Sequence, residues 1–325
     1  MKILVTGGAG YIGSHTCLAL KKAGHEPIVL DSLVTGHEWA VKYGPFVKGD
    51  IADEETVRQL CAEYRPQALI HFAGFIDVAE SVEQPAKYFE NNFEKAQILF
   101  DTVLDCGIKK AVFSSTAAVY GSPESEEPIK ETHPLRPINP YGESKLRTEN
   151  YLRELEGKGM RFAALRYFNA AGAASVEEAI GEAHDPETHL IPNMLLAGLG
   201  KREGLSVFGD DYPTRDGTAL RDYVHVMDLA AAHMASIGYL IAGGKSGAFN
   251  VGSGYGATVL EVLQTASWVM GKEIPYSLKT RRAGDPPFLL ADISKIRDEM
   301  AWSPEYSLAE IIETALAWHN SNVCK

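Results

Sequence analysis

A glycine-rich loop near the N-terminus limits the folds open to this chain more than any other feature. The apolar run at residues 2–6 is predicted to form a short buried strand, and Gly7, Gly8, Gly10 and Gly13 follow it directly. These glycines fit both GxGxxG and GxxGxxG, a pattern typical of the turn between the first strand and the first helix of a dinucleotide-binding unit. In such a turn, bare backbone and a helix N-terminus can approach a pyrophosphate. The alternative is a glycine turn with only a structural role.

Short apolar runs alternate with helical patterns through the first half of the chain. Between two of these runs, Val57, Leu60, Cys61 and Tyr64 fall at the spacing of an apolar helical stripe packed on a sheet. Repeated alternation implies right-handed crossovers, and we therefore expect an α/β fold with a doubly wound, Rossmann-like parallel sheet. The predicted strands are residues 2–6, 27–31, 46–50, 68–72, 111–116 and 161–167.

The second half of the chain is predicted to add a smaller, substrate-binding lobe. After Asn169 the strand and helix pattern loosens into loops that contain glycine, proline and aspartate. We expect the nucleotide-binding domain to comprise residues 1–168 plus about 222–250. The substrate lobe would then comprise residues 169–221 plus about 251–325.

The composition is that of a folded globular protein and disfavours several classes of partner. Of the 325 residues, 45% are hydrophobic and 23% charged, and the formal net charge is −12. We expect no binding to nucleic acid or to anionic membranes, because either would need a basic face. The N-terminal apolar run is too short for a signal sequence or a membrane span, and no later run is long enough to span.

The cysteines predict a reducing compartment. Cys17, Cys61, Cys106 and Cys324 are widely spaced and form no CxxC pair. This pattern is typical of free thiols in a cytoplasmic protein. We expect no metal site.

Tyr141 and Lys145 are candidate catalytic residues. Placed four residues apart on a helix, they project from one face, so that an ammonium can lie near a phenol. A free phenol has a pKa of about 10, and a nearby cation would lower it and make Tyr141 a usable general base. Thr116 ends a predicted central strand, where ligands of open α/β sheets bind. Taken alone, the Tyr/Lys spacing is also compatible with an ordinary solvated helix.

Asp31 is a candidate determinant of cofactor choice. It ends the second predicted strand, where a carboxylate can accept hydrogen bonds from both ribose hydroxyls and repel a 2′-phosphate. This position favours NAD over NADP. The alternative is an aspartate that caps a helix.

These motifs together resemble the extended short-chain dehydrogenase/reductase family. Within it, the chain is similar nearly end to end to the UDP-glucose 4-epimerases, and the run at residues 208–218 is the most specific match. The matching segments are residues 7–15, 70–74, 114–116, 119–121, 165–169, 208–218 and 221–229.

The resemblance implies an NAD cofactor, a UDP-sugar substrate and a homodimer formed by helices of the nucleotide lobe. Tyr141, Lys145 and Thr116 would form the catalytic group. The residues implied to bind the cofactor are Gly7, Gly10, Tyr11, Ile12, Gly13, Asp31, Asp50, Ile51, Phe72, Ala73, Gly74, Asn91, Ser114, Tyr141, Lys145 and Tyr167. The residues implied to bind the substrate are Thr116, Asn169, His189, Leu190, Phe208, Arg221, Arg282, Asp285 and Leu289.

The implied reaction is inversion at C4 of the sugar, which converts UDP-glucose to UDP-galactose and back. Tyr141 would take the proton from O4 while hydride passes from C4 to the nicotinamide, giving a transient 4-keto sugar. Thr116 would orient O4. Because UDP anchors the substrate away from the reacting carbon, the keto sugar can turn and receive the hydride on its other face. NAD would stay bound through the cycle.

Three positions depart from familiar members of the family or set its specificity. Ile76 stands where some epimerases carry a cofactor-contacting Lys, and His189 stands where some carry a substrate-contacting Asn. Leu289 aligns near a position whose bulk is linked to sugar size, where Tyr goes with hexoses and smaller residues admit N-acetylhexosamines. UDP-xylose/UDP-arabinose and UDP-GlcNAc/UDP-GalNAc therefore stay open as alternative substrate pairs.

Two further classes of protein share this fold. Nucleotide-sugar 4,6-dehydratases resemble one another in carrying Asp-Glu after the Ser/Thr, and UDP-glucuronate decarboxylases also carry an acidic residue there, whereas this chain has Ala117 and Ala118. A non-catalytic NAD-sensing protein is the alternative from another class. Such proteins typically lose the Tyr/Lys pair, which is intact here.

Overall fold

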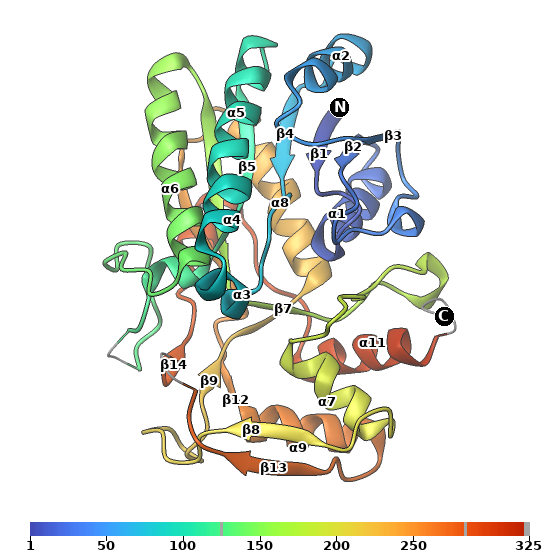
Figure 1. Cartoon of the computed structure of the whole chain (residues 1–325), viewed down its shortest axis with the longest axis vertical. Coiled ribbons are helices and arrows are strands. Elements are labelled where there is room, and N and C mark those ends of the chain that lie inside the picture. The colour runs from blue at the N-terminus through green and yellow to red at the C-terminus, as the bar shows by residue number, and fades with distance from the viewer. Residues whose placement is uncertain (124–125, 283–284, 322–325) are drawn as a thin grey trace.

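A seven-stranded parallel sheet forms the centre of the larger part of the molecule (Figure 1). The computed structural model describes residues 1–123, 126–282 and 285–321. The strand order is β11-β6-β5-β4-β1-β2-β3, and every pairing is parallel. The strands are β1 Lys2–Thr6, β2 Glu26–Asp31, β3 Phe46–Lys48, β4 Ala68–His71, β5 Lys110–Thr116, β6 Arg161–Tyr167 and β11 Gly247–Val251. The predicted doubly wound, Rossmann-like sheet is confirmed.

The strands predicted in the first half of the chain are all present, with small differences at their ends. β3 ends at Lys48 and β4 at His71, whereas the predicted ends were residues 50 and 72. The seventh strand, β11, was not predicted as a strand. Its sequence Gly-Ala-Phe-Asn-Val contains the fully buried Asn250, and this polar residue interrupts the apolar run that marks the other strands.

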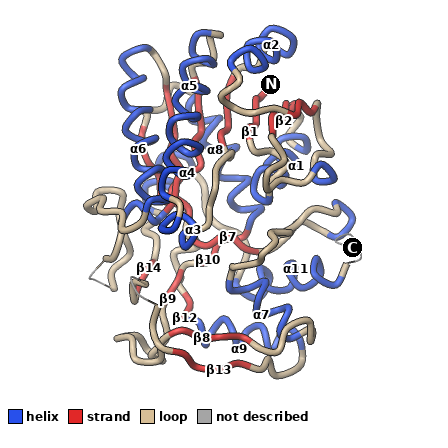
Figure 2. The backbone as a smooth tube through the Cα atoms, in the orientation of Figure 1, coloured by secondary structure: helices blue, strands red, loops and turns tan. Residues whose placement is uncertain are grey.

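Helices cover both faces of the sheet, as Figure 2 shows. One core lies under α2, α5 and α6, and the opposite core lies under α1, α8 and α10. In α2, Val57, Leu60 and Cys61 are buried and Tyr64 packs beside them, which confirms the predicted stripe. These helices are α1 Tyr11–Lys22, α2 Glu54–Tyr64, α5 Lys95–Asp105, α6 Pro140–Leu155, α8 Val226–Ile241 and α10 Ser294–Met300.

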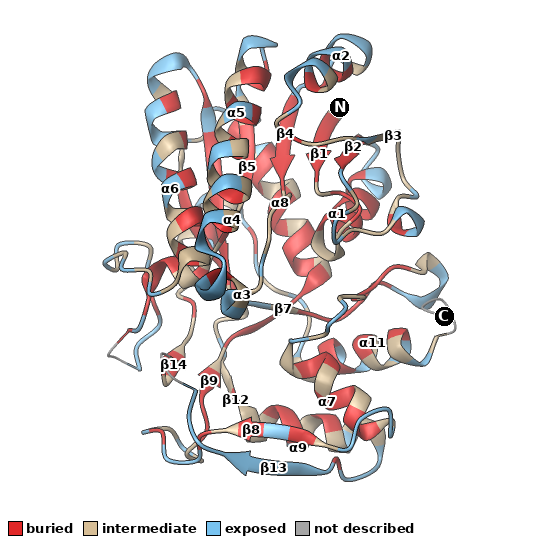
Figure 3. Ribbon diagram, viewed as in Figure 1, coloured by how far each residue is buried: buried red, intermediate tan, exposed pale blue. Residues whose placement is uncertain are grey.

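The smaller lobe is built from short sheets and three helices around a core of its own. β13 lies on its outer surface and is exposed, whereas the facing strand β8 is half buried (Figure 3). The helices are α7 Leu190–Gly198, α9 Val259–Met270 and α11 Leu308–Asn320. The paired strands are β7 Asn169–Ala171 with β10 Tyr223–His225, β9 Leu220–Arg221 with β12 Ala257–Thr258 and β14 Phe288–Leu289, and β8 Leu205–Phe208 with β13 Tyr276–Lys279.

Short helices and 3₁₀ turns form several of the connections between these elements. The sequence α3, α4 and a π-helical turn η2 leads directly into α5. The bounds are α3 Val78–Glu83, α4 Pro85–Phe89, η2 Glu90–Glu94, and the 3₁₀ turns η1 Glu38–Ala40, η3 Ala117–Tyr120, η4 Glu156–Lys158 and η5 Val176–Glu178. Within the described ranges, no helix is both long and apolar enough to cross a membrane.

Candidate active site

The backbone around the glycine loop leaves no room for a side chain at Gly7 or at Gly13. Gly7 has a φ of +73°, and a Cβ there would lie 2.5 Å from the backbone nitrogen of Ala73. A Cβ on Gly13 would lie 2.2 Å from the carbonyl oxygen of Gly7. Gly10 precedes α1, and no side chain caps that helix or places an acidic group in its first turn. The first backbone N–H groups of α1 are therefore suited to an anion such as the pyrophosphate of NAD.

Asp31 lies beside this loop at the end of β2. Its two carboxylate oxygens accept hydrogen bonds from the backbone N–H groups of Ala9, at 2.9 Å, and Leu33, at 2.8 Å. Each oxygen keeps a further lone pair, so the carboxylate can also accept from ribose hydroxyls. The residues present therefore fit a dinucleotide.

The negative charge of Asp31 predicts a strong preference for NAD. We expect NADP to bind the cofactor-free protein at least tenfold more weakly, or about 1.4 kcal/mol, because its 2′-phosphate would meet a like charge. Calorimetry with both cofactors measures the ratio. Asp31→Asn should bring the affinities for NAD and NADP closer together, because a neutral amide does not repel the 2′-phosphate. Equal affinities for the two cofactors in the wild-type protein would refute this role of Asp31.

The remaining residues predicted to bind the cofactor follow the ends of the central strands. After β3, Asp50 forms an ion pair with Lys95, at 2.5 Å, and Ile51 is buried in the core. After β4, Phe72 packs against the imidazole of His233, with 4.6 Å between ring centroids. Tyr167, at the end of β6, contacts the same imidazole through its hydroxyl, at 2.7 Å from Nε2. The structure thus brings these positions to the carboxyl edge of the sheet, where α/β folds bind ligands.

Tyr141, Lys145 and Thr116 meet at the end of β5. The side chain of Asn139 caps α6 by accepting from the backbone N–H of Gly142, which fixes the first turn that carries Tyr141. The Thr116 side chain lies close enough to the phenol of Tyr141 to lower its pKa. The ammonium of Lys145, one turn later, donates to the carbonyl of Ser114 at 2.9 Å. The three predicted catalytic side chains therefore share one site.

The electrostatics of this site differ from the expectation of a lowered phenol pKa. Burial raises the pKa of Tyr141, and the Thr116 side chain opposes that rise only in part. Burial also lowers the pKa of Lys145 to about 8. The ammonium is directed at the Ser114 carbonyl and lies 5.1 Å from the centroid of the Phe113 ring. In the protein without NAD, the effect of burial on the pKa of Tyr141 is therefore larger than any effect of the Lys145 charge.

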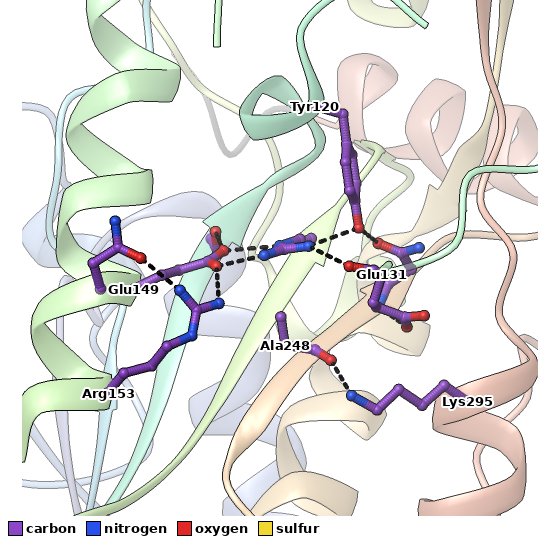
Figure 4. Close-up of polar contacts among 10 residues, drawn as sticks. Tyr120, Glu131, Glu149, Arg153, Ala248 and Lys295 are labelled. Atoms are coloured by element: carbon purple, nitrogen blue, oxygen red, sulfur yellow. Dashed lines mark hydrogen bonds and ion pairs between the residues drawn. The ribbon is translucent and has the colours of Figure 1, made fainter. Parts of the chain in front are cut away.

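A buried polar network behind the site holds α6 against the sheet, as Figure 4 shows. The guanidinium of Arg166 donates to both carboxylate oxygens of Glu149, at 2.9 and 2.6 Å. It also donates to the hydroxyl of Tyr120, at 3.0 Å, and the Ser115 hydroxyl donates to Glu149 at 2.5 Å. Glu149 follows Lys145 by one helical turn and Ser115 precedes Thr116, so the network fixes the positions of two catalytic residues.

Asn92, like Glu149 and Arg166, was not among the residues predicted from the sequence. It lies in the π-helical turn η2 and is buried. Its amide oxygen accepts from the backbone N–H of Phe75, at 2.8 Å, and its amide nitrogen donates to the carbonyl of Phe75, at 2.9 Å. Adjacent Asn91, a predicted cofactor residue, donates to the same oxygen at 3.0 Å. Asn92 thus holds the segment after Gly74, which itself lies beside the Lys145 ammonium.

The predicted substrate residues form two groups in the smaller lobe. Arg221 pairs with Leu289 across β9 and β14 and forms an ion pair with Asp285. The guanidinium of Arg282 lies 4.0 Å from the centroid of the Phe208 ring. Leu289 also packs against the apolar cluster around η3, which follows Thr116. We call Arg221, Arg282, Asp285 and Phe208 the arginine group. Leu289 lies between this group and the catalytic group of Tyr141, Lys145 and Thr116.

The other predicted substrate residues lie on β7 and at the start of α7. Asn169 donates from its side chain to the carbonyl of Asp222 at 2.9 Å. His189 precedes α7 and its Nδ1 contacts Glu187 at 2.8 Å, whereas Leu190 packs on the core of the lobe. Across the described ranges, no hydrogen bond or ion pair links His189 or Leu190 to the arginine group.

Comparisons with known proteins agree with this arrangement. The model of the NAD dependent epimerase/dehydratase family matches residues 3–252. A UDP-glucose 4-epimerase of Lacticaseibacillus casei is 50% identical over 325 residues, which are 99% of this chain and 98% of that protein. The crystal structure of UDP-glucose 4-epimerase from Brucella ovis in complex with NAD has 44% identity and a TM-score of 0.94, with 97% of each chain covered.

A second similar structure contains a nucleotide sugar. The UDP-glucose 4-epimerase from Stenotrophomonas maltophila, with bound NAD and formylated UDP-arabinopyranose, has 36% identity and a TM-score of 0.95. The match covers 98% of this chain and 97% of that one. With a family match over most of its length and relatives of this similarity, the chain belongs to the NAD dependent epimerase/dehydratase family.

Proposed function

We propose that this protein is an isomerase that uses NAD to interconvert UDP-glucose and UDP-galactose by inversion at C4. The observation that carries the proposal is the meeting of Tyr141, Lys145 and Thr116 at the end of β5, beside a glycine loop that fits NAD. Full-length similarity to UDP-glucose 4-epimerases supports the same reaction.

Each catalytic residue has one task in this reaction. Thr116 orients O4 of the sugar, and Tyr141 accepts the O4 proton and later returns it. When bound, NAD would accept a hydride from C4 of the sugar and return it. Lys145 places a positive charge on the helix that carries Tyr141, which favours the phenolate against the cost of burial. The sugar passes through a 4-keto form that turns before the hydride returns.

The predicted cofactor and substrate residues take the remaining tasks. Arg221 and Arg282 would hold the diphosphate, because two guanidiniums can each donate paired hydrogen bonds to phosphate oxygens. Asp31 would hold the ribose of NAD. We propose that the NAD-binding domain comprises residues 1–168 plus about 222–250, and that the UDP-sugar lobe comprises residues 169–221 plus about 251–325. Pairing of β11 with β6 supports this division, and pairing of β7 with β10 joins the two parts. Helix α10 packs on the core of the NAD-binding sheet, although its residues fall in the range of the UDP-sugar lobe.

The residues after Thr116 disfavour the dehydratase and decarboxylase alternatives. Ala117 is buried, and the backbone N–H of Ala118 donates to the Thr116 hydroxyl at 3.1 Å. Neither side chain can transfer a proton. Elimination of water needs additional acid–base groups, which this position does not supply.

We also propose a homodimer and a cytoplasmic location. The homodimer is what the resemblance to the UDP-glucose 4-epimerases implies, with helices of the nucleotide lobe at its interface. Cys17, Cys61 and Cys106 are free thiols, as a reducing compartment requires, and Cys324 lies outside the described residues. Light scattering of the purified protein measures the assembly.

The most direct test follows the products. Purified protein is equilibrated separately with UDP-glucose, UDP-GlcNAc and UDP-xylose, and the products are resolved by NMR. We expect UDP-galactose from UDP-glucose as the fastest conversion. Absence of any C4 epimer, or release of a dehydrated sugar, would contradict the proposal.

Replacing Lys145 with Met should show what its charge contributes. Without the ammonium, the phenolate of Tyr141 is less stable, so its pKa should rise further. The acidic limb of the profile of kcat against pH should therefore move to higher pH, with a lower rate at neutral pH. A profile and rate equal to those of the wild type would refute this role.

Replacing Leu289 with Tyr should test the boundary of the sugar pocket. Leu289 is shorter than Tyr and lies between the arginine group and η3, so we expect fast epimerisation of UDP-glucose and weaker activity on UDP-GlcNAc. The added bulk in Leu289→Tyr should lower kcat/KM for UDP-GlcNAc by about tenfold or more relative to UDP-glucose. An unchanged ratio would place Leu289 outside the pocket.

A further inference from the structure

Three side chains gather beside the glycine loop in an arrangement that no step of the reaction above uses. Glu182, His184 and His189 each offer one ligand atom, and these atoms all lie within 4.8 Å of one another. The Glu182 side chain is 8% exposed, whereas those of His184 and His189 are 24% and 41% exposed. The three ligand atoms thus converge on a point that an ion can reach from solvent.

We propose that Glu182, His184 and His189 bind one divalent transition-metal ion, with zinc as the expected occupant. Two imidazoles and one carboxylate form a set of three protein ligands that zinc accepts, with a further position left for water or a phosphate oxygen. Imidazole also favours zinc over magnesium, which prefers oxygen ligands alone.

A carboxylate outside the ligand set orients one of the imidazoles. Oε1 of Glu187 lies 2.8 Å from Nδ1 of His189 and also accepts from the His189 backbone N–H at 2.7 Å. This contact leaves Nε2 of His189 for a metal. Metal-binding histidines almost always have such a partner on the second ring nitrogen, because it fixes the tautomer and the ring orientation.

The second imidazole lies directly against the carboxylate of the cluster. Nδ1 of His184 forms an ion pair with the carboxylate of Glu182. The backbone N–H of His184 donates to the same carboxylate at 3.0 Å, which holds the ring next to it. The fold therefore keeps this imidazole and this carboxylate together, as a shared ion requires.

The backbone around the cluster is tied to three other parts of the fold. The carbonyl of Glu182 accepts from the indole N–H of Trp318 at 2.6 Å, and the carbonyl of Ala183 lies 3.0 Å from Nε2 of His37. His189 is the N-cap residue of α7. Figure 1 shows this segment between β7 and α7, near α1 and α11. An ion here would fasten the segment against the glycine loop, because Tyr11 and Glu182 line the same cavity.

The test measures zinc affinity directly. The full-length protein with its NAD is freed of metal by a chelator, and zinc is then titrated in competition with a chromophoric chelator. We expect one zinc per chain in the wild type and loss of that binding in the double variant His184→Ala/His189→Ala. Glu187→Gln should weaken zinc binding about 10–100-fold while keeping all three ligands. His133→Ala, which removes a half-buried imidazole elsewhere, should bind zinc as the wild type does.

Two controls distinguish a folding defect from the loss of a side chain that binds the metal. NAD content and the circular dichroism spectrum report whether each variant is folded, and Glu187→Gln changes one charge with little change in shape. Equal zinc affinity in the wild type, the double variant and Glu187→Gln would overturn the proposal. Magnesium binding as tight as zinc binding would overturn it as well.

Discussion

Replacing Tyr141 with Phe should lower kcat by about 10²–10⁴-fold while NAD stays bound. The substitution removes the hydroxyl that accepts the O4 proton and leaves the ring in place, and general acid–base catalysis typically contributes a factor of this size. The Thr116 hydroxyl keeps its hydrogen bond from the backbone N–H of Ala118, so the variant leaves that side chain in place. Turnover at saturating UDP-glucose, together with the NAD content of the purified variant, measures the effect.

Tyr151→Phe is the matched control for this variant. Tyr151 lies on the same helix, and its hydroxyl donates to Asp101 at 2.5 Å, away from the catalytic group. We expect its turnover to stay within about twofold of the wild type, since general acid–base catalysis acts only at the reacting atoms. Near-normal turnover of Tyr141→Phe would remove Tyr141 as the proton acceptor.

The sheet could be predicted because its strands obey a local rule. The strands from β1 to β6 contain apolar runs, such as residues 3–5 and 162–165, and such runs are typical of a buried parallel sheet. In β11 the apolar run is shorter, because Asn250 follows Ala248 and Phe249, and its side chain donates to the carbonyl of Ile129 in a network that only the folded chain assembles. Periodicity is a local property and cannot anticipate such a contact.

The site could be predicted only in part, because local spacing identifies candidate residues but not the contacts that the folded chain makes. Spacing along one helix and one strand identified Tyr141, Lys145 and Thr116 as candidates, and these three do meet. Spacing did not predict that burial would outweigh the charge of Lys145 at the phenol, because desolvation depends on what packs around a group. Glu182, His184 and His189 were missed as a set, since their meeting depends on the fold of the segment before α7.

The charged pair of Glu149 and Arg166 was also not predicted from the sequence. It holds α6, the helix that carries Tyr141 and Lys145, against the sheet. Glu149 is fully buried and Arg166 is 1% exposed. Burial alone would lower the pKa of Arg166, but the hydrogen bonds and charge of Glu149 raise it above its ordinary value. Arg166 therefore stays charged, and its charge is compensated inside the protein. The pair joins α6 to β6, while Ser115 extends it to β5.

Replacing Glu149 with Gln should destabilise the protein by about 3–5 kcal/mol, the cost of leaving a buried charge without its partner. Reversible denaturant unfolding measures this loss. Glu143→Gln on the same helix is the matched control, because it breaks an exposed pair with Arg147 and should cost less than about 1 kcal/mol. A double variant, Glu149→Leu/Arg166→Met, removes both charges and should regain most of the lost stability. If Glu149→Gln were no less stable than Glu143→Gln, the buried pair would not hold α6 to the sheet.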